Sequence, residues 1–422
     1  MWESLATTRA QDRALHGAAK AANVAFGLVA IPAWLLGQRL AIPLRRAMLE
    51  RSEHEALPTP DAQEPSMDEL MDELEAIPHR LEPNSWGETR KGLRDLSSFV
   101  LAQTRQGLDV GYSYPAQFND EWFVGADGEH IGCSIAVHEQ PRPGLVVVHG
   151  LFSSRRFDYV REIAVRAFYE WGFNVCAIDL RGFGATEYLS RAPSTAGWKE
   201  GSDIVCAARF LKASGSTTVG ALGISLGGSS VLAACHVEGA EEALDGGVIA
   251  IAAPADTHYM VRRISRPRSR ERRYDPMVGL QAMLRSRIHA SRWPVDFEDF
   301  SDPIERLAAP YYGVEPAEIW ERSSARNTIA GARVPVLVLH SADDWLVPVR
   351  QAEILRVAAR ENDLVRVWTV AAGGHGAADA VDERWAYAVY RRFFERWARY
   401  PDRDGAEMVY SPAPDGKVEV SG

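Results

Sequence analysis

The sequence predicts an α/β fold, in which a mostly parallel central sheet is covered by helices on both faces. From about residue 119 onward, short and continuously apolar runs alternate with longer amphipathic runs, as expected for buried parallel strands and their crossover helices. The pentapeptide Gly223-Ile224-Ser225-Leu226-Gly227 lies between one such apolar run and a helix-like run. In that setting a sharp strand-to-helix turn exposes a serine hydroxyl.

The composition is that of a globular protein with room for one large domain and additions. The chain has 422 residues, of which 46% are hydrophobic and 25% charged, and its net charge is −10. An acidic balance argues against a general nucleic-acid-binding protein. The four cysteines are scattered without a C-x-x-C pattern, so we expect free thiols rather than disulfides or metal ligands, in keeping with a reducing compartment. They are Cys133, Cys176, Cys206 and Cys235.

Residues 1–110 differ in character from the rest and are predicted to form a helical extension and linker. Residues 21–38, from Ala21 to Gln38, contain no charged side chain. We favour an apolar helical pair that packs on the main domain or makes peripheral contact with a membrane. A membrane-spanning helix is the alternative, but the run is short and Pro32 interrupts it. A signal peptide is disfavoured because no small-x-small cleavage site follows.

The acidic segment 50–77 begins as a proline-containing linker and ends in an expected short helix. Ser66 and Glu69 have the spacing of a capping box. A surface helix is preferred over a partner-binding site because four apolar residues share one helix face. These are Met67, Leu70, Met71 and Leu74.

The main domain is predicted over residues 111–400. Strands at 121–124 and 130–138 are joined through Asp127-Gly128, a hairpin signal. Further strands are expected at 145–148, 173–178, 217–221, 247–252, 334–339 and 364–370, and helices at 158–169, 198–213, 226–235 and 383–400. The polar tail 401–422 is expected to be disordered.

Residues 253–333 interrupt the alternation between the sixth and seventh strands of the sheet. Insertions after a strand lie over the ligand-binding edge of such sheets, so this segment is predicted to be a lid. Seven arginines crowd into it: Arg262, Arg263, Arg266, Arg268, Arg270, Arg272 and Arg273. A solvated loop is the preferred interpretation of this cluster, and attraction of anionic substrates or lipid headgroups is the alternative.

Ser225 requires a base and an acid, because a serine hydroxyl is a weak nucleophile at its own pKa. On an elbow of this type the chain order is serine, acid, histidine. His375 lies in Gly373-Gly374-His375-Gly376, directly after the apolar run 364–370, and is the predicted base.

Asp344 is the predicted acid, because it follows the strand 334–339 and is itself followed, after two residues, by Val347-Pro348. Its neighbour Asp343 is the alternative and is otherwise expected to serve as a turn or supporting residue. Asp256, after the preceding strand, is a second alternative.

Two backbone N–H groups are needed to stabilise the negative charge that develops on the substrate oxygen. Leu226, directly after the nucleophile, is one predicted donor, at a helix N-terminus. Leu151 is the other, in His149-Gly150-Leu151 at the end of the strand 145–148. The side chain of His149 is expected to brace this loop rather than to take part in the chemistry.

Together, these motifs resemble the α/β-hydrolase superfamily over residues 119–400. The resemblance adds Asp179-Leu180-Arg181-Gly182-Phe183-Gly184 to the elbow, the acid loop and Gly374-His375-Gly376. The chain is most similar to the embryogenesis-associated branch of esterases, although the usual Asp-Asp-Pro is Asp-Asp-Trp here. The resemblance implies an α/β-hydrolase fold and hydrolysis of short- to medium-chain or lipid-like carboxylic esters, without a metal or organic cofactor.

The sequence therefore predicts a serine esterase that works through an acyl-enzyme. An acyltransferase or thioesterase would use the same three residues, and a non-catalytic binding protein on this fold is the remaining alternative. A cytoplasmic location is expected, with membrane association through residues 21–38 as described above. No pattern in the sequence indicates an oligomeric state.

Overall fold

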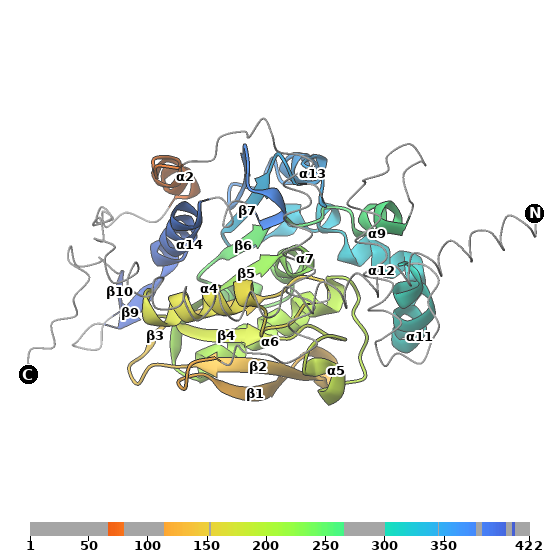
Figure 1. The fold of residues 1–422 in the computed structure, drawn as a ribbon, viewed down its shortest axis with the longest axis horizontal. Helices are drawn as coiled ribbons and strands as arrows, with labels where there is room; N and C mark the ends of the chain where they lie inside the picture. The colour runs from red at the N-terminus through yellow and green to blue at the C-terminus, as the bar shows by residue number, and fades with distance from the viewer. Residues whose placement is uncertain are drawn as a thin grey trace, which may run out of the picture.

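The computed structural model describes residues 66–79, 114–151, 153–265, 300–344, 346–376, 382–401 and 407–409. Its centre is an eight-stranded sheet with strand order β1-β2-β4-β3-β5-β6-β7-β8 (Figure 1). β1 and β2 are antiparallel to their neighbours, and the remaining six strands are parallel to one another. The predicted α/β-hydrolase fold, with a mostly parallel sheet, is therefore confirmed.

The strands of this sheet are β1 (Asn119–Val124), β2 (His130–Ala136), β3 (Arg142–Val148), β4 (Asn174–Ile178), β5 (Ser216–Ile224), β6 (Val248–Ile251), β7 (Val336–Ser341) and β8 (Val365–Val370). The helices that follow or connect them are η1 (Ala126–Gly128), α4 (Asp158–Tyr169), α5 (Thr186–Leu189), α6 (Trp198–Ala213), α7 (Leu226–Ala234), α8 (Ala240–Ala243), α13 (Arg350–Ala358), η5 (Gly374–Gly376) and α14 (Glu383–Trp397).

The sheet has a hydrophobic core on each face, because successive side chains of a strand point to opposite sides. Along β3, Val146 and Val148 belong to the core on one face, which also contains residues of α6, α7 and α13. Leu145 and Val147 pack with α4 and α14 on the other. Burial on both faces explains why the central strands are continuously apolar in the sequence.

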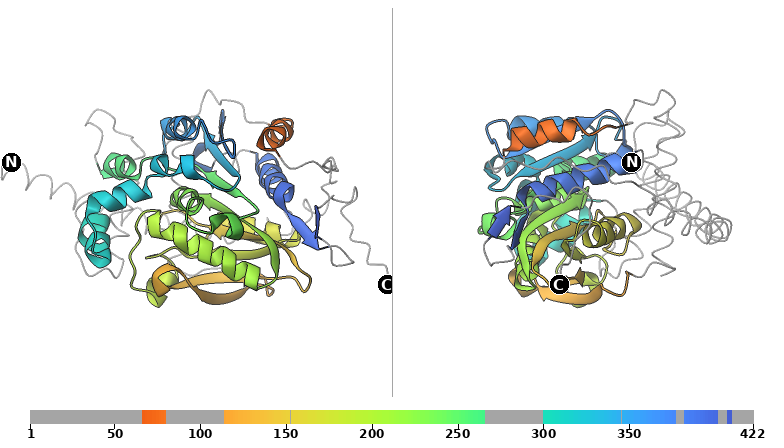
Figure 2. Two further views of the ribbon diagram at one scale, coloured as in Figure 1. Left: turned by 180° about the vertical axis from the view of Figure 1, so that it is seen from behind. Right: turned by 90° about the vertical axis from the view of Figure 1, so that its left-hand side faces the viewer.

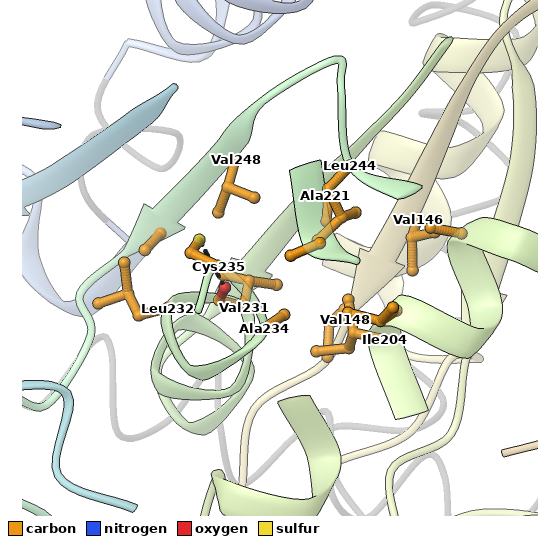
Figure 3. Packing of buried hydrophobic residues seen from close by; sticks show 14 of the residues in the cluster. Val146, Val148, Ile204, Ala221, Val231, Leu232, Ala234, Cys235, Leu244 and Val248 are labelled. Atoms are coloured by element: carbon orange, nitrogen blue, oxygen red, sulfur yellow. Dashed lines mark hydrogen bonds between the residues drawn. The ribbon is translucent and has the colours of Figure 1, made fainter. Parts of the chain in front are cut away.

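Close packing on the first face is visible around Cys235, where Val231, Leu232 and Val248 surround the end of α7 (Figure 3). The Cys235 thiol donates a hydrogen bond to the Val231 carbonyl oxygen at 3.1 Å, and burial raises the pKa of this thiol. All four cysteines are free, as predicted, although Cys206 is only half-buried.

Helix α2 (Met67–Glu75) belongs to the predicted N-terminal extension, yet it packs against α14 (Figures 1 and 2). The Ser66 side chain accepts N–H bonds from Asp68 and Glu69, which confirms the predicted N-cap. Met67, Leu70 and Leu74 are buried against the second core. Four ion pairs flank this contact: Arg392 with Glu73, Arg396 with both Glu69 and Glu73, and Arg366 with Asp68.

The predicted closing helix 383–400 ends at Trp397, three residues early. A short strand, β9 (Arg399–Pro401), follows it and pairs in antiparallel fashion with β10 (Glu407–Val409). This pairing places strands where the sequence predicts the end of a helix and a disordered tail.

The described part of the insertion 253–333 is helical. It comprises α9 (Thr257–Ser265), η2 (Pro303–Ala308), α11 (Ala309–Tyr312), α12 (Pro316–Ser323), η3 (Ala325–Asn327) and η4 (Ile329–Gly331). α9, α11 and α12 gather on the side of the molecule opposite to α2 and β9 (Figures 1 and 2). Of the seven clustered arginines, Arg262 and Arg263 lie on α9, and the other five are outside the described residues.

No helix among the residues that the structure describes is long and apolar enough to cross a bilayer. Residues 21–38, for which peripheral membrane contact is predicted, lie outside the described ranges.

Candidate active site

Ser225 lies at a sharp turn between β5 and α7. Its backbone has φ 58° and ψ −115°, in the positive-φ region that non-glycine residues rarely adopt. The Ser225 N–H donates to the Ile251 carbonyl oxygen at 2.8 Å, and the Ser225 carbonyl oxygen accepts the first helical bond from Ser229. The main chain is therefore held on both sides of a strained residue.

The glycines of the pentapeptide are required because neighbouring backbone approaches closely. A Cβ atom added at Gly227 would lie 2.5 Å from the His149 carbonyl oxygen. One added at Gly223 would overlap the Gly227 carbonyl. Any side chain at either position would force the turn away from β3 or open the turn itself.

Ser225 is partly exposed within an otherwise buried stretch of β5 and α7. Between residues 218 and 235, Ser225 is the one residue that is not buried. Serine is a favoured N-cap residue, yet the Ser225 side chain makes no capping bond with α7. The helix therefore does not sequester the hydroxyl.

Asp344 and His375 are brought together by the loops that follow the adjacent strands β7 and β8. His375 Nδ1 lies 2.9 Å from Asp344 Oδ2 and 3.2 Å from Oδ1. The Asp344 side chain is fully buried, whereas that of His375 is 20% exposed. A carboxylate facing Nδ1 selects the tautomer with the proton there, which leaves Nε2 as a proton acceptor.

The Asp344 carboxylate is fixed by its own loop. Its Oδ1 accepts the N–H groups of Leu346 and Val347 at 2.9 and 2.8 Å. The Nε2 atom of the buried His340 lies 2.9 Å from the Val347 carbonyl oxygen and 3.8 Å from Asp344 Oδ2. Burial lowers the pKa of His340, although Asp344 opposes this effect, so we assign a neutral imidazole whose Nε2–H donates to Val347.

The two alternative acids have other partners. Asp343 accepts the Gly374 N–H at 2.8 Å. Asp256 pairs with Arg326 at 2.7 Å and accepts the Tyr259 N–H at 2.8 Å. Asp256 also lines a cavity of about 550 Å³ between α9 and α12, whose lining does not include Ser225, Asp344 or His375.

The loop after β3 runs directly against the turn at Ser225. A Cβ atom added at Gly150 would lie 3.4 Å from the Ser225 Cβ, so Leu151 follows a residue that lies beside Ser225. Leu226 is the first residue of α7, and first-turn N–H groups have no partner within their own helix. Both predicted donors therefore lie at the same edge of the sheet as the partly exposed Ser225.

His149 braces this loop, as predicted. Its Nδ1 lies 2.7 Å from the Gly150 carbonyl oxygen, and its Nε2 lies 3.0 Å from the Leu180 nitrogen, whose N–H it accepts. Burial lowers the pKa of the imidazole, with nearby Asp179 acting in the opposite direction. A neutral ring with one donor and one acceptor satisfies both contacts.

Tyr159 is a further residue at this edge that the sequence did not reveal. Its hydroxyl accepts the Gly150 N–H at 2.8 Å and donates to Ser153 Oγ at 3.0 Å. It lies in the first turn of α4. A tyrosine in that position has no sequence signal beyond ordinary helix patterning.

The Asp179-x-Arg181 motif ties the surrounding loops together. Buried Asp179 accepts the Arg155 N–H at 2.7 Å and the Ala185 N–H at 2.8 Å, and it pairs with the Arg155 guanidinium. Arg181 forms two bonds with Asp203, at 2.5 and 2.8 Å, and one with the Tyr312 hydroxyl at 3.1 Å. Through Tyr312, this buried network reaches α11 of the insertion.

The described geometry thus places a partly exposed serine at a strand-to-helix turn after β5, and a histidine–carboxylate pair in the loops after β7 and β8. A model of the alpha/beta hydrolase family matches residues 145–392. The chain therefore belongs to the alpha/beta hydrolase family.

Among characterised proteins, the Monoacylglycerol lipase of Saccharomyces cerevisiae is 24% identical over 275 residues, which cover 61% of this chain and 60% of the lipase. The chain therefore matches less than two thirds of that relative. A solved esterase of Pyrococcus furiosus has a TM-score of 0.49 and 17% identity, covering 68% of this chain and 97% of its own. A puromycin-hydrolysing peptidase of Mycobacterium tuberculosis has a TM-score of 0.46 and 18% identity, covering 66% and 38%.

Proposed function

We propose that the protein is a serine hydrolase that cleaves carboxylic esters through an acyl-enzyme on Ser225. The observation that carries this proposal is the hydrogen bond between His375 and Asp344, in loops at the same end of the sheet as the partly exposed Ser225. Membership of the alpha/beta hydrolase family supports it, because an elbow serine followed by acid and histidine is the nucleophilic arrangement of this fold.

In the proposed reaction, Ser225 Oγ attacks the acyl carbonyl carbon while His375 Nε2 accepts its proton. Asp344 stabilises the imidazolium that forms. The N–H groups of Leu151 and Leu226 stabilise the oxyanion of the tetrahedral intermediate. His375 then protonates the leaving alcohol as the acyl-enzyme forms. Water, activated by the same histidine, hydrolyses the acyl-enzyme and restores Ser225.

The substrate class that we propose is a short- to medium-chain or lipid-like ester. The relative named above is a monoacylglycerol lipase. We also propose that the chain belongs to the embryogenesis-associated branch of esterases, which its motifs resemble. We also assign residues 253–333 as the lid, because α9 begins at Thr257, shortly after the C-terminal end of β6, and Tyr312 of α11 is bonded to buried Arg181. No cofactor enters the scheme.

A panel of p-nitrophenyl esters from acetate to palmitate tests this proposal. Wild type should cleave part of the panel, and S225A should lose activity by about 10⁶-fold, as removal of a catalytic serine does elsewhere. S214A is a suitable control, because Ser214 caps the C-terminal end of α6 and should leave turnover unchanged. The proposal would be contradicted if wild type cleaved no ester in the panel. It would also be contradicted if S225A cleaved esters as fast as an active wild type.

A further inference from the structure

We propose that Asp343 is a positioning residue that holds the main chain of His375, while Asp344 holds its ring. This inference rests on the proposed function, since it assigns a role in orienting the proposed base. Asp343 is neither the acid nor a residue that contacts substrate in this scheme. Its contribution is the hydrogen bond that its carboxylate accepts from the residue preceding His375.

Three consecutive residues of the acid loop bind the histidine loop in turn. The Ala342 N–H donates to the Val370 carbonyl oxygen at 2.8 Å, at the end of β8. Asp343 Oδ1 accepts the Gly374 N–H at 2.8 Å, and Asp344 Oδ2 lies 2.9 Å from His375 Nδ1. The two loops are thereby joined at the strand end, at the backbone before the base and at the base itself.

The hydrogen bond from Gly374 to Asp343 matters because the glycine-rich loop that carries His375 has high conformational freedom. Gly373 has φ 149° and Gly374 has φ 62°, and both values lie in regions where glycine is the favoured residue. Glycine loses more conformational freedom on ordering than any other residue, so this backbone does not order itself. His375 lies in a single 3-10 turn, Gly374–Gly376, which adds little restraint of its own.

The side chain at 343 can therefore influence the rate without contacting the substrate. Misplacement of a catalytic group by about 1 Å can cost about 10²-fold in rate. Without the Asp343 acceptor, the Gly374 N–H loses its bond, and the backbone directly before His375 loses one of its restraints. The substrate-binding surface stays the same, so the loss is expected in kcat and not in KM.

Asp343→Ala and Asp343→Asn separate the hydrogen bond from the charge, since an asparagine oxygen can still accept the Gly374 N–H. We expect D343A to lower kcat by about 10-fold or more with KM unchanged within about twofold, and D343N to stay within about threefold of wild type. An unchanged kcat in D343A would overturn the proposal. So would a D343N variant that falls as far as D343A, because the acceptor would then not be what matters.

Hydrogen exchange at the Gly374 amide tests the same bond without any substrate. In the full-length protein, the peptide covering residues 371–376 should exchange faster in D343A than in wild type, and D343N should keep the wild-type protection. Equal exchange rates in all three proteins would overturn the proposal that Asp343 holds the Gly374 backbone, even if esterase activity is established. If wild type cleaves no ester, the proposed function fails, while this measurement still decides whether Asp343 holds the loop. Asp343→Ser, whose shorter side chain cannot reach Gly374, replaces D343A if that variant does not fold.

Discussion

The Nδ1 atom of His375 lies 2.9 Å from Oδ2 of Asp344, across two loops that follow adjacent parallel strands. The carboxylate is fully buried and is held by two N–H groups of its own loop. It therefore cannot turn away from the imidazole without breaking those bonds. The relationship selects one tautomer of His375 and leaves Nε2 available to the proposed nucleophile.

Asp344→Asn should lower kcat by about 10⁴-fold, because the amide favours the wrong tautomer of the imidazole. Steady-state kinetics on the preferred p-nitrophenyl ester measures the change. Asp256→Asn provides the matched control, since Asp256 pairs with Arg326, and it should stay within about threefold of wild type. A large loss in D256N together with normal activity in D344N would show that Asp256, and not Asp344, is the acid.

Tyr159→Phe should lower kcat by roughly 10-fold, which is less than the 10²–10³-fold cost of removing an oxyanion donor. The variant removes the acceptor of the Gly150 N–H and so loosens the backbone before Leu151. Tyr188→Phe, at a tyrosine that is 66% exposed on α5, should have no effect. Equal rates for Y159F and wild type would show that the Leu151 loop does not depend on this hydroxyl.

Two adjacent tyrosines should differ in their contribution to stability. The Tyr312 hydroxyl donates to the Pro193 carbonyl oxygen and accepts from buried Arg181, so Y312F should cost about 1–3 kcal/mol in the free energy of unfolding. The Tyr311 hydroxyl bonds to Glu129 at the surface, and Y311F should cost about 0.5 kcal/mol or less. Urea unfolding measures both. If the two variants lose the same amount, Tyr312 does not anchor α11 to the core.

The free energy of unfolding should fall as the pH drops below about 6.5. Burial is the main cause that lowers the pKa of four histidines in the folded state: His138, His149, His236 and His340. The unfolded chain then binds more protons than the folded one below about pH 6.5, so protonation favours unfolding. This contribution to stability is fully present at pH values above the unfolded histidine pKa. It is lost as the pH falls from that value through the lower pKa values of the folded state.

Urea unfolding between pH 7.5 and pH 5.5 tests this dependence, and H340Q should show a shallower slope than wild type. Each proton of difference contributes at most about 1.4 kcal/mol per pH unit. Identical slopes for H340Q and wild type would mean that His340 does not titrate differently in the two states.

Periodicity predicted the elements because it reports burial. The expected helices 158–169 and 198–213 coincide with α4 and α6. The predicted ends of strands were less accurate, because polar residues and glycines at a strand end interrupt the apolar run from which the strand is predicted. β5 continues to Ile224, through Gly223, because its end pairs with β6, whereas the apolar run suggested an end at residue 221. Pairing between strands decides such ends, and the sequence of one strand does not encode it.

Chain order is the information from which the candidate site is predicted. Ser225, Asp344 and His375 are predicted from that order and from their positions after strands, and the structure brings Asp344 and His375 together. The partners of the supporting residues were not predictable. Asp343 is expected to be a turn or supporting residue, but the sequence does not show that it binds a backbone N–H 31 residues away, nor that Tyr312 binds a guanidinium 131 residues away. Neither contact leaves a periodic or local trace in the sequence.

Covalent labelling with a fluorophosphonate tests the central claim most directly, because such probes react with an activated serine and require no knowledge of the natural ester. After labelling and proteolysis, mass spectrometry should place the added phosphonyl group on Ser225 in wild type and find none in S225A. The rate of labelling should also fall in D344N. Failure of wild type to react, or labelling of S225A at the wild-type rate, would contradict the assignment of Ser225 as the nucleophile.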